Sequence, residues 1–116
     1  MDWSSYQEVN NMSNITKLYF EKPSRVEYRL PDKEDPMTGD MVPVRHNVGA
    51  PAVITDLGYK AWYQNGIRHR EDGPAIEFDD FKVWYVNGVK HRTDGPAVEF
   101  SDGSVQYWEH GVRILK

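Results

Sequence analysis

The amino-acid sequence predicts an all-β fold, an antiparallel meander of repeated β-hairpins that forms an elongated, twisted, single-layer sheet. Three observations support this prediction. Two-residue Asn-Gly and Asp-Gly turns recur with a period of 22–23 residues. Valine outnumbers leucine twelve to four, which favours pleated, half-buried strands over helical packing. Fifteen of the 116 residues are aromatic, so large rings can supply a core where aliphatic side chains are scarce.

An internal repeat organises the chain. Residues 62–75 return as residues 84–97 with an offset of 22, and a partial copy with an offset of 23 follows at residues 107–113. Upstream, residues 46–52 align with residues 69–75, again with an offset of 23. A fixed period of this length indicates an architecture in which each unit packs mainly on its neighbours.

The segment before the clear repeats is less regular. We expect residues 1–15 to form a polar N-terminal arm, with one short helix over residues 4–11 and Trp3 as an anchor. Residues 16–116 then form the repeat domain. It consists of a degenerate repeat at 16–52 with an insertion at 30–40, followed by repeats at about 53–75, 76–97 and 98–116. In the degenerate repeat, residues 26–29 align with residues 83–86.

Turn signals divide each repeat into strands. Asn87-Gly88 lies between two valines and predicts a type I′ hairpin turn, which needs positive φ at both central residues. Asp94-Gly95 and Asp102-Gly103 predict further turns, and Pro96 stands at a strand start, where its missing N–H is tolerated. Each unit is therefore expected to run strand, Asn-Gly turn, short strand, Asp-Gly-Pro turn, strand.

Alternation along the strands predicts two aromatic ladders on opposite faces of the sheet. We expect one ladder to be core packing and the other to be an exposed, partner-binding strip. The core ladder consists of Trp62, Trp84 and Tyr107, and the exposed ladder consists of Tyr63, Tyr85 and Trp108.

The element His-Arg-x-Asp-Gly occurs twice, with His69 and Asp72 in one copy and His91 and Asp94 in the other. An imidazole and a carboxylate three residues apart are a possible base and orienter, or a pair of metal ligands. A structural role explains the recurrence better, because an enzyme seldom needs one active site per repeat. We expect the Asp to accept hydrogen bonds from turn N–H groups and the His or Arg to bond a neighbouring carbonyl.

Composition narrows the function further. The absence of cysteine excludes disulfides and thiolate metal sites, and we expect no cofactor and no metal. A net charge of −4 argues against direct binding of nucleic acid through phosphate neutralisation. Neither a long apolar run nor a signal-peptide pattern is present, so we expect no membrane association and a cytoplasmic location.

The motif Trp-Tyr-x-Asn-Gly-x-x-His-Arg-x-Asp-Gly-Pro-Ala, at 22–23 residues per period, resembles the MORN-like repeats of phage and large-virus proteins and of bacterial MORN-variant antitoxins. The resemblance covers residues 45–116 well and residues 17–44 poorly. It departs from the standard MORN pattern by having His-Arg-x-Asp-Gly-Pro in place of a Gly-rich turn. The resemblance implies an elongated twisted sheet that binds another protein along an aromatic groove and performs no chemistry.

These observations lead to one functional expectation and two alternatives. We expect a non-enzymatic protein-binding module, in its sharpest form a phage or mobile-element inhibitor that acts in the host cytoplasm by blocking a bacterial defence or toxin protein. The alternatives are an immunity or antitoxin protein that neutralises a cognate nuclease, and a structural component that self-associates through open sheet edges; a homodimer is compatible with such edges. The expected partner-binding residues are Tyr63, Tyr85 and Trp108, joined by Pro31, Asp32, Glu34 and Asp35 of the insertion.

Overall fold

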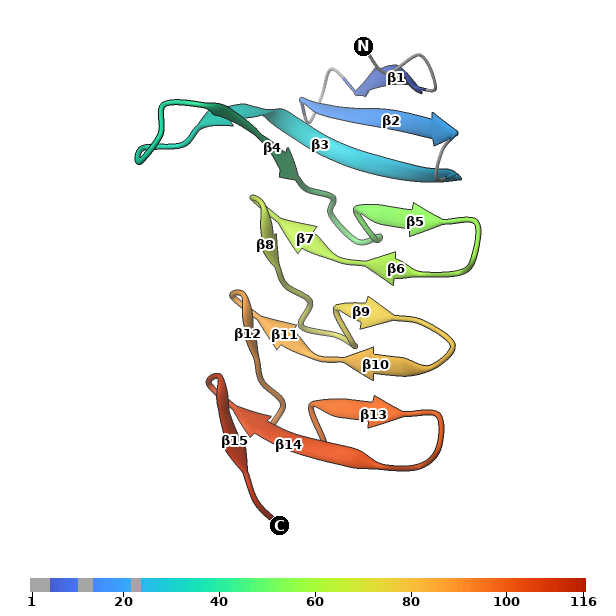
Figure 1. The fold of residues 1–116 in the computed structure, drawn as a ribbon, viewed down its shortest axis with the longest axis vertical. Helices are drawn as coiled ribbons and strands as arrows, with labels where there is room; N and C mark the ends of the chain where they lie inside the picture. Colours follow the sequence, from blue (N-terminus) through green and yellow to red (C-terminus); the bar gives the residue numbers. More distant parts are fainter. Residues whose placement is uncertain (1–4, 11–13, 22–23) are drawn as a thin grey trace.

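The computed structural model shows an open, hairpin-rich, antiparallel all-β meander, so the predicted fold class is confirmed (Figure 1). It describes the backbone of residues 5–10 and all atoms of residues 14–21 and 24–116. The main sheet has the strand order β1-β2-β3-β5-β6-β9-β10-β13-β14-β15, and β4 pairs with β3. Its strands follow one another along the longest axis of the molecule, which measures 47 Å.

The strands in the described part of the chain are short. They are β1 (Ser5–Asn10), β2 (Ile15–Glu21), β3 (Ser24–Glu34), β4 (Met41–Arg45), β5 (Val53–Thr55), β6 (Lys60–Ala61), β7 (Tyr63–Gln64), β8 (Ile67–Arg68), β9 (Ile76–Glu77), β10 (Phe81–Val83), β11 (Tyr85–Val86), β12 (Val89–Lys90), β13 (Val98–Phe100), β14 (Val105–Glu109) and β15 (Val112–Ile114).

Each repeat contributes to two columns of strands that lie side by side in Figure 1. One column contains the pairs β5–β6 and β9–β10 together with β13, and the other contains β4 and the hairpins β7–β8, β11–β12 and β14–β15. The chain passes between columns at Trp62 and Trp84, which interrupt the strands, whereas β14 runs continuously through Tyr107.

The hairpin turns have the backbone conformation that the sequence predicts. Asn87 and Gly88 have φ values of 51° and 83°, and Asn65 and Gly66 have nearly the same values of 52° and 82°. Positive φ at both central residues is the type I′ pattern, whose twist matches that of the flanking strands. In the third hairpin His110 replaces Asn and keeps a φ of 52°.

Each turn is hydrogen-bonded to the hairpin of the preceding repeat. The N–H of Gly88 donates to the carbonyl of Arg68 at 2.8 Å, and the N–H of Asn87 donates to Nδ1 of His69 at 3.0 Å. A Cβ on Gly88 would approach Ile67 to 3.0 Å, so this glycine also permits close stacking on the β-branched side chain below it. The same arrangement joins Asn65 and His110 to the imidazoles of His46 and His91, at 2.9 Å in each case.

The stack changes at its C-terminal end. Ile114 occupies the place in the last hairpin that His91 and His69 hold in the preceding ones. Val112 has the position of Val89 and Ile67, and it is 66% exposed because none of the described residues stacks a further turn upon it.

The main hydrophobic cluster is a row of side chains across the main sheet. Its buried members face one another directly in the strand register, so they share one face. They are Val53, Ala61, Ile76, Val83 and Val98, each no more than 8% exposed. The row ends in polar residues, because Glu27 pairs with Val53 at one end and Gln106 pairs with Val98 at the other.

The expected helix over residues 4–11 is wrong where the structure describes that segment. Ser5–Asn10 forms β1, which pairs antiparallel with β2 from Ser5 opposite Phe20 to Asn10 opposite Ile15. An edge strand gives these backbone groups ladder partners that an isolated short helix would not provide. Trp3, the expected anchor, lies outside the described residues.

The alignment of the degenerate repeat is wrong by one residue. Glu27 faces Val53 across β3 and β5, as Val83 faces Val98 across β10 and β13. Glu27 therefore has the place of Val83, whereas the sequence alignment gave it the place of Trp84. A shift of one residue moves every side chain of a strand to the opposite face, and here it puts a carboxylate into the core row.

The insertion at residues 30–40 is an ordered extension of the β3–β4 hairpin that projects from the sheet (Figure 1). β3 continues through Pro31, which lies where the β3–β4 register shifts between Leu30 and Lys33. Such an irregularity accommodates a residue that lacks an N–H. The extension closes at a turn in which the N–H of Asp35 donates to the carbonyl of Asp40 at 2.7 Å.

We predict that His91→Ala lowers the free energy of unfolding by about 1 kcal/mol, because the N–H of His110 loses its acceptor. The imidazole of His91 also packs on that of His110, with ring centroids 4.4 Å apart. Thermal unfolding should shift down by about 4 °C. His110→Asn is the matched control, since it restores the Asn-Gly turn and keeps the acceptor. Equal melting temperatures for His91→Ala and the unmodified chain would rule out this role.

Candidate functional site

The structure assigns the two aromatic ladders to faces differently from the prediction. Tyr63, Tyr85 and Trp108, expected to form an exposed strip, are half-buried and pack against the core row. Trp62 and Trp84, expected to form the core, lie on the opposite face. The two ladders lie on opposite faces, as the strand alternation predicts, and the residues of both are half-buried.

Arginines cover the tryptophans on that opposite face. The guanidinium carbon of Arg92 lies 4.0 Å from the centre of the Trp84 ring, a cation–π contact. Its Nε donates to Asp94 at 2.9 Å, and one terminal nitrogen donates to the carbonyl of Pro96 and to Glu99, at 3.0 Å each. The guanidinium thus shields the indole ring and ties the turn to strand β13.

The preceding repeat has the same contacts. Arg70 lies 3.9 Å from the ring centre of Trp62 and donates to Asp72, Pro74 and Glu77 at 2.8–3.0 Å. Asp72 therefore accepts from an arginine side chain, which corrects the expectation that it accepts from turn N–H groups. The histidines also act differently from the expectation, since their Nδ1 atoms accept from N–H groups of the next turn.

The glycine of the Asp-Gly-Pro turn is explained by this arginine. Gly73 and Gly95 do not have positive φ, in contrast to Gly103 at 90°. A Cβ on Gly95 would lie 2.9 Å from the guanidinium carbon of Arg92, and Gly73 has the same relation to Arg70. Glycine at these positions lets the arginine lie directly against the backbone without being displaced.

Two shallow grooves lie along the tryptophan face, with volumes of about 540 and 560 Å³. They share Arg70, Glu71 and Asp72 as a common wall, and the carboxylates at their rims are exposed. Because Arg70 and Arg92 already serve their own turns, we assign this face to the stability of the repeat.

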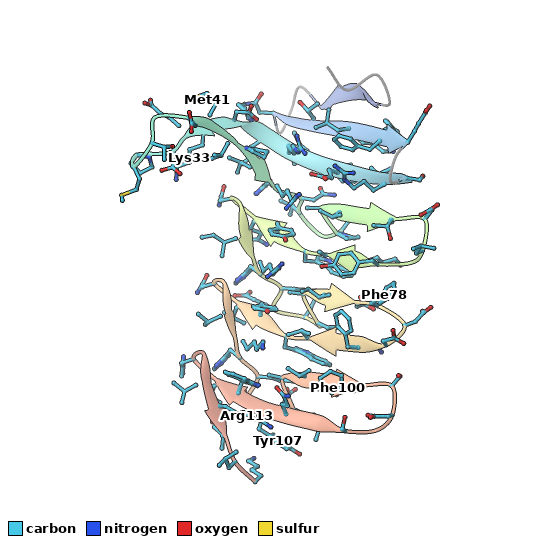
Figure 2. All side chains as sticks on the ribbon, in the orientation of Figure 1. Lys33, Met41, Phe78, Phe100, Tyr107 and Arg113 are labelled. Carbon is cyan, nitrogen blue, oxygen red and sulfur yellow. The ribbon has the colours of Figure 1, made fainter. Side chains whose placement is uncertain are left out.

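The other face carries an alternating series of cations and rings in the second column of strands. We call it the cation–aromatic row, and we define it, in strand order, as Arg29, Arg45, Tyr63, Arg68, Tyr85, Lys90, Trp108 and Arg113. Each hairpin contributes two members that face each other directly in its register. Figure 2 labels the last cation, Arg113, on β15 at the C-terminal end of the stack.

Cations and rings of successive hairpins are in contact along the row. The guanidinium of Arg68 lies between two tyrosines, 5.8 Å from the ring centre of Tyr63 and 5.5 Å from that of Tyr85. Nζ of Lys90 lies 4.6 Å from the ring centre of Trp108. Burial lowers the pKa of Arg68, but its interactions with Tyr63 and Tyr85 outweigh this and raise the pKa above its ordinary value. The guanidinium therefore stays charged although it is half-buried.

The row is short of negative charge. Among the described residues, Arg68, Lys90 and Arg113 form no ion pair with a carboxylate, and Nε of Arg68 is buried without a hydrogen-bond partner. Lys60 and Lys82 of the tryptophan face form no ion pair within the described part of the chain either, but both lie opposite a carboxylate, Glu77, in the strand register. Positive charge thus remains available on the cation–aromatic row.

A buried carboxylate anchors the N-terminal end of the row. Glu27 is fully buried and accepts from Arg25 at 2.6 Å, from Arg29 at 2.8 Å and from Arg45 at 3.0 Å. Burial raises the pKa of this carboxyl, but the hydrogen bonds from the three arginines prevail and lower the pKa from 4.5 to about 2. This cluster was not predicted from the sequence, although the three arginines lie two to eighteen residues from Glu27.

The predicted residues of the insertion lie near the same end. Pro31, Asp32 and Glu34 belong to β3 and follow Arg29 after one intervening residue, and Asp35 begins the turn. Lys33 and Met41 mark the projecting part of this hairpin in Figure 2. The insertion is therefore adjacent to the row, but it does not share the column of Tyr63, Tyr85 and Trp108.

The described residues offer neither a metal site nor a membrane-spanning helix. Within residues 14–21 and 24–116, no group of three or more His, Asp or Glu side chains is placed to hold a metal ion. The same part of the chain contains no helix that is long and apolar enough to cross a membrane. No protein-family model, curated protein or solved structure matches this chain.

The Glu27 cluster makes the stability of the fold depend on pH. Since the pKa of Glu27 is lowered on folding, its contribution is complete above pH 4.5 and is lost as the pH falls towards 2. The expected loss is about 3 kcal/mol. Urea unfolding of the unmodified chain and of Glu27→Gln should show a stability difference that is large at neutral pH and disappears near pH 2. A difference that does not change with pH would contradict the ionised cluster.

The close contact between Gly95 and Arg92 is tested by a double-mutant cycle. We predict that Gly95→Ala costs about 1 kcal/mol, because the new methyl group displaces the guanidinium from Trp84 and Glu99. In an Arg92→Ala background the same change should cost almost nothing. Equal costs in both backgrounds, measured by chemical denaturation, would show that the two residues are not coupled.

Proposed function

We propose that this chain is a non-enzymatic, MORN-like protein-binding module whose interface is the cation–aromatic row. The observation that carries the proposal is a run of cations without a carboxylate partner among the described residues, beside half-buried rings on a single face, in three successive hairpins. These cations are Arg68, Lys90 and Arg113. Aromatic and arginine side chains are the types most enriched at protein interfaces.

The fold supports this use in two ways. The row follows the 47 Å axis, so a partner can contact several equivalent hairpins at once. Its rings also rest on the buried core row, which fixes their orientation before binding and lowers the entropy lost on association. In this proposal Tyr63, Tyr85 and Trp108 form a rigid apolar floor.

In its sharpest form the proposal is a phage or mobile-element inhibitor that covers the active or binding surface of a bacterial defence or toxin protein. The repeat motif supports this form through its resemblance to MORN-like proteins of phages. An immunity or antitoxin protein would use the same interface against a cognate nuclease. The projecting β3–β4 extension, with Pro31, Asp32, Glu34 and Asp35, would contribute specificity, because recognition is commonly placed on loops held by a rigid scaffold.

Charge-matched variants test the interface. Lys90→Gln combined with Arg113→Gln removes two cations from the row, and Lys60→Gln combined with Lys82→Gln removes two from the opposite face. We predict that capture of a specific protein from bacterial lysate, scored by mass spectrometry, is lost with the first pair and retained with the second. Circular dichroism should be unchanged for both.

Tyr63→Ala and Tyr85→Ala are less suitable as binding variants, since these rings pack against the core and their loss destabilises the fold. Capture that survives the change in the row, or that fails equally with the control pair, would contradict the proposed interface.

Self-association is the second candidate, and the exposed strand β15 favours it. Val112 is 66% and Leu115 is 85% exposed at this end of the sheet. Antiparallel pairing of two copies through β15 would, however, bring their Arg113 side chains close together, which opposes the contact. Light scattering distinguishes the two functions, because a series of species that grows with concentration would favour self-assembly.

A further inference from the structure

The charge of the row determines the chemistry of its partner. Arg29, Arg45, Arg68, Lys90 and Arg113 supply five cations, and Glu27 beside them neutralises one. The whole chain nevertheless has a net charge of −4, so the positive charge of this face is opposite in sign to the net charge of the molecule. A partner that adds carboxylates here would supply the acceptors that Arg68, Lys90 and Arg113 lack among the described residues.

The spacing of the row determines the conformation of that partner. Equivalent positions in successive hairpins are two strands apart, which corresponds to about 9.5 Å. A polyproline II segment returns to the same face every three residues, after about 9.3 Å. A β-strand returns to the same face after about 6.7 Å, and an α-helix after seven residues and about 10.5 Å. Of these three repeat distances, that of polyproline II is nearest to the spacing of the hairpins, so only this conformation stays aligned with the row over four hairpins.

We propose that the cation–aromatic row binds an acidic polyproline II segment of a partner protein, with one carboxylate every third residue. Three carboxylates meet the unpaired cations Arg68, Lys90 and Arg113, and a fourth shares Arg45 with Glu27. The intervening residues pack against the ring edges of Tyr63, Tyr85 and Trp108. The inference rests on the proposed function and adds the class of ligand.

The rings fit this ligand. Tyrosine and tryptophan grooves bind proline-rich segments elsewhere because the preformed helix loses little entropy on binding. Single-stranded nucleic acid, the other anionic polymer, would need ring faces free for base stacking. Here Arg68 lies over the ring of Tyr85 and Lys90 lies over that of Trp108, so these ring faces are not open to bases. A polyproline II segment can instead pack against the ring edges and the aliphatic stems of the cations, so the observations favour the peptide.

Synthetic peptides test the proposal directly. The probe is a fluorescently labelled, capped peptide of four Pro-Pro-Glu units, and binding is measured by fluorescence anisotropy at low and physiological salt. The controls are a peptide of identical composition with its glutamates adjacent, a peptide of four Pro-Pro-Lys units, and an oligothymidylate of similar length. We expect the periodic acidic peptide to bind about tenfold more tightly than the grouped one, and the lysine peptide not to bind.

The protein variants give the matching control. Lys90→Gln with Arg113→Gln should weaken binding of the periodic peptide about fivefold, since two exposed charge contacts are lost. Lys60→Gln with Lys82→Gln, which changes the net charge equally on the other face, should leave the affinity unchanged.

The proposal is overturned if the periodic and grouped peptides bind equally, if both variants weaken binding to the same extent, or if the oligothymidylate binds as tightly as the peptide. The capture experiment distinguishes failure of the ligand class from failure of the protein-binding function. A partner that is captured through the row while no acidic peptide binds would refute the ligand class and retain the protein-binding function.

Discussion

The structure depends on one interaction that is repeated at each step of the stack: a hairpin turn hydrogen-bonded to the hairpin before it. The turn N–H meets an imidazole Nδ1, while its glycine lies against a β-branched side chain, as Gly88 lies against Ile67. Because the sheet has a single layer, a globular core cannot correct an error in this alignment. This contact between turn and hairpin therefore fixes the register of each repeat, and the register in turn aligns the rows of side chains on both faces.

The two faces of the sheet differ in how their positive charges are balanced, and this difference recurs in each repeat. On the tryptophan face, Arg70 and Arg92 are bound by carboxylates of their own repeats, so their charge is neutralised locally. On the cation–aromatic row the partners of the cations are rings, which attract a cation without cancelling its charge. A modest net charge of −4 thus conceals one face that is strongly positive.

The sequence was sufficient to predict the fold class, the hairpin turns and the alternation of the strands, because Asn87-Gly88 and its copies require positive φ wherever they occur. It was insufficient for the burial of the two aromatic ladders, since both are half-buried. Tryptophan was expected inside, but Arg92 covers Trp84 through contacts that only the folded turn creates. The register of the first repeat failed for a related reason, since Glu27 in a core position becomes stable only when three arginines converge on it.

The last hairpin lacks the histidine of the preceding ones, because Ile114 stands at that position. In each earlier step, the histidine of one hairpin accepts a hydrogen bond from the N–H of the next turn. With a branched aliphatic side chain at this place, a further turn docked on β15 would find an apolar surface where its N–H needs an acceptor. Ile114 therefore separates the last described hairpin from the contact between imidazole and turn N–H that joins the hairpins before it.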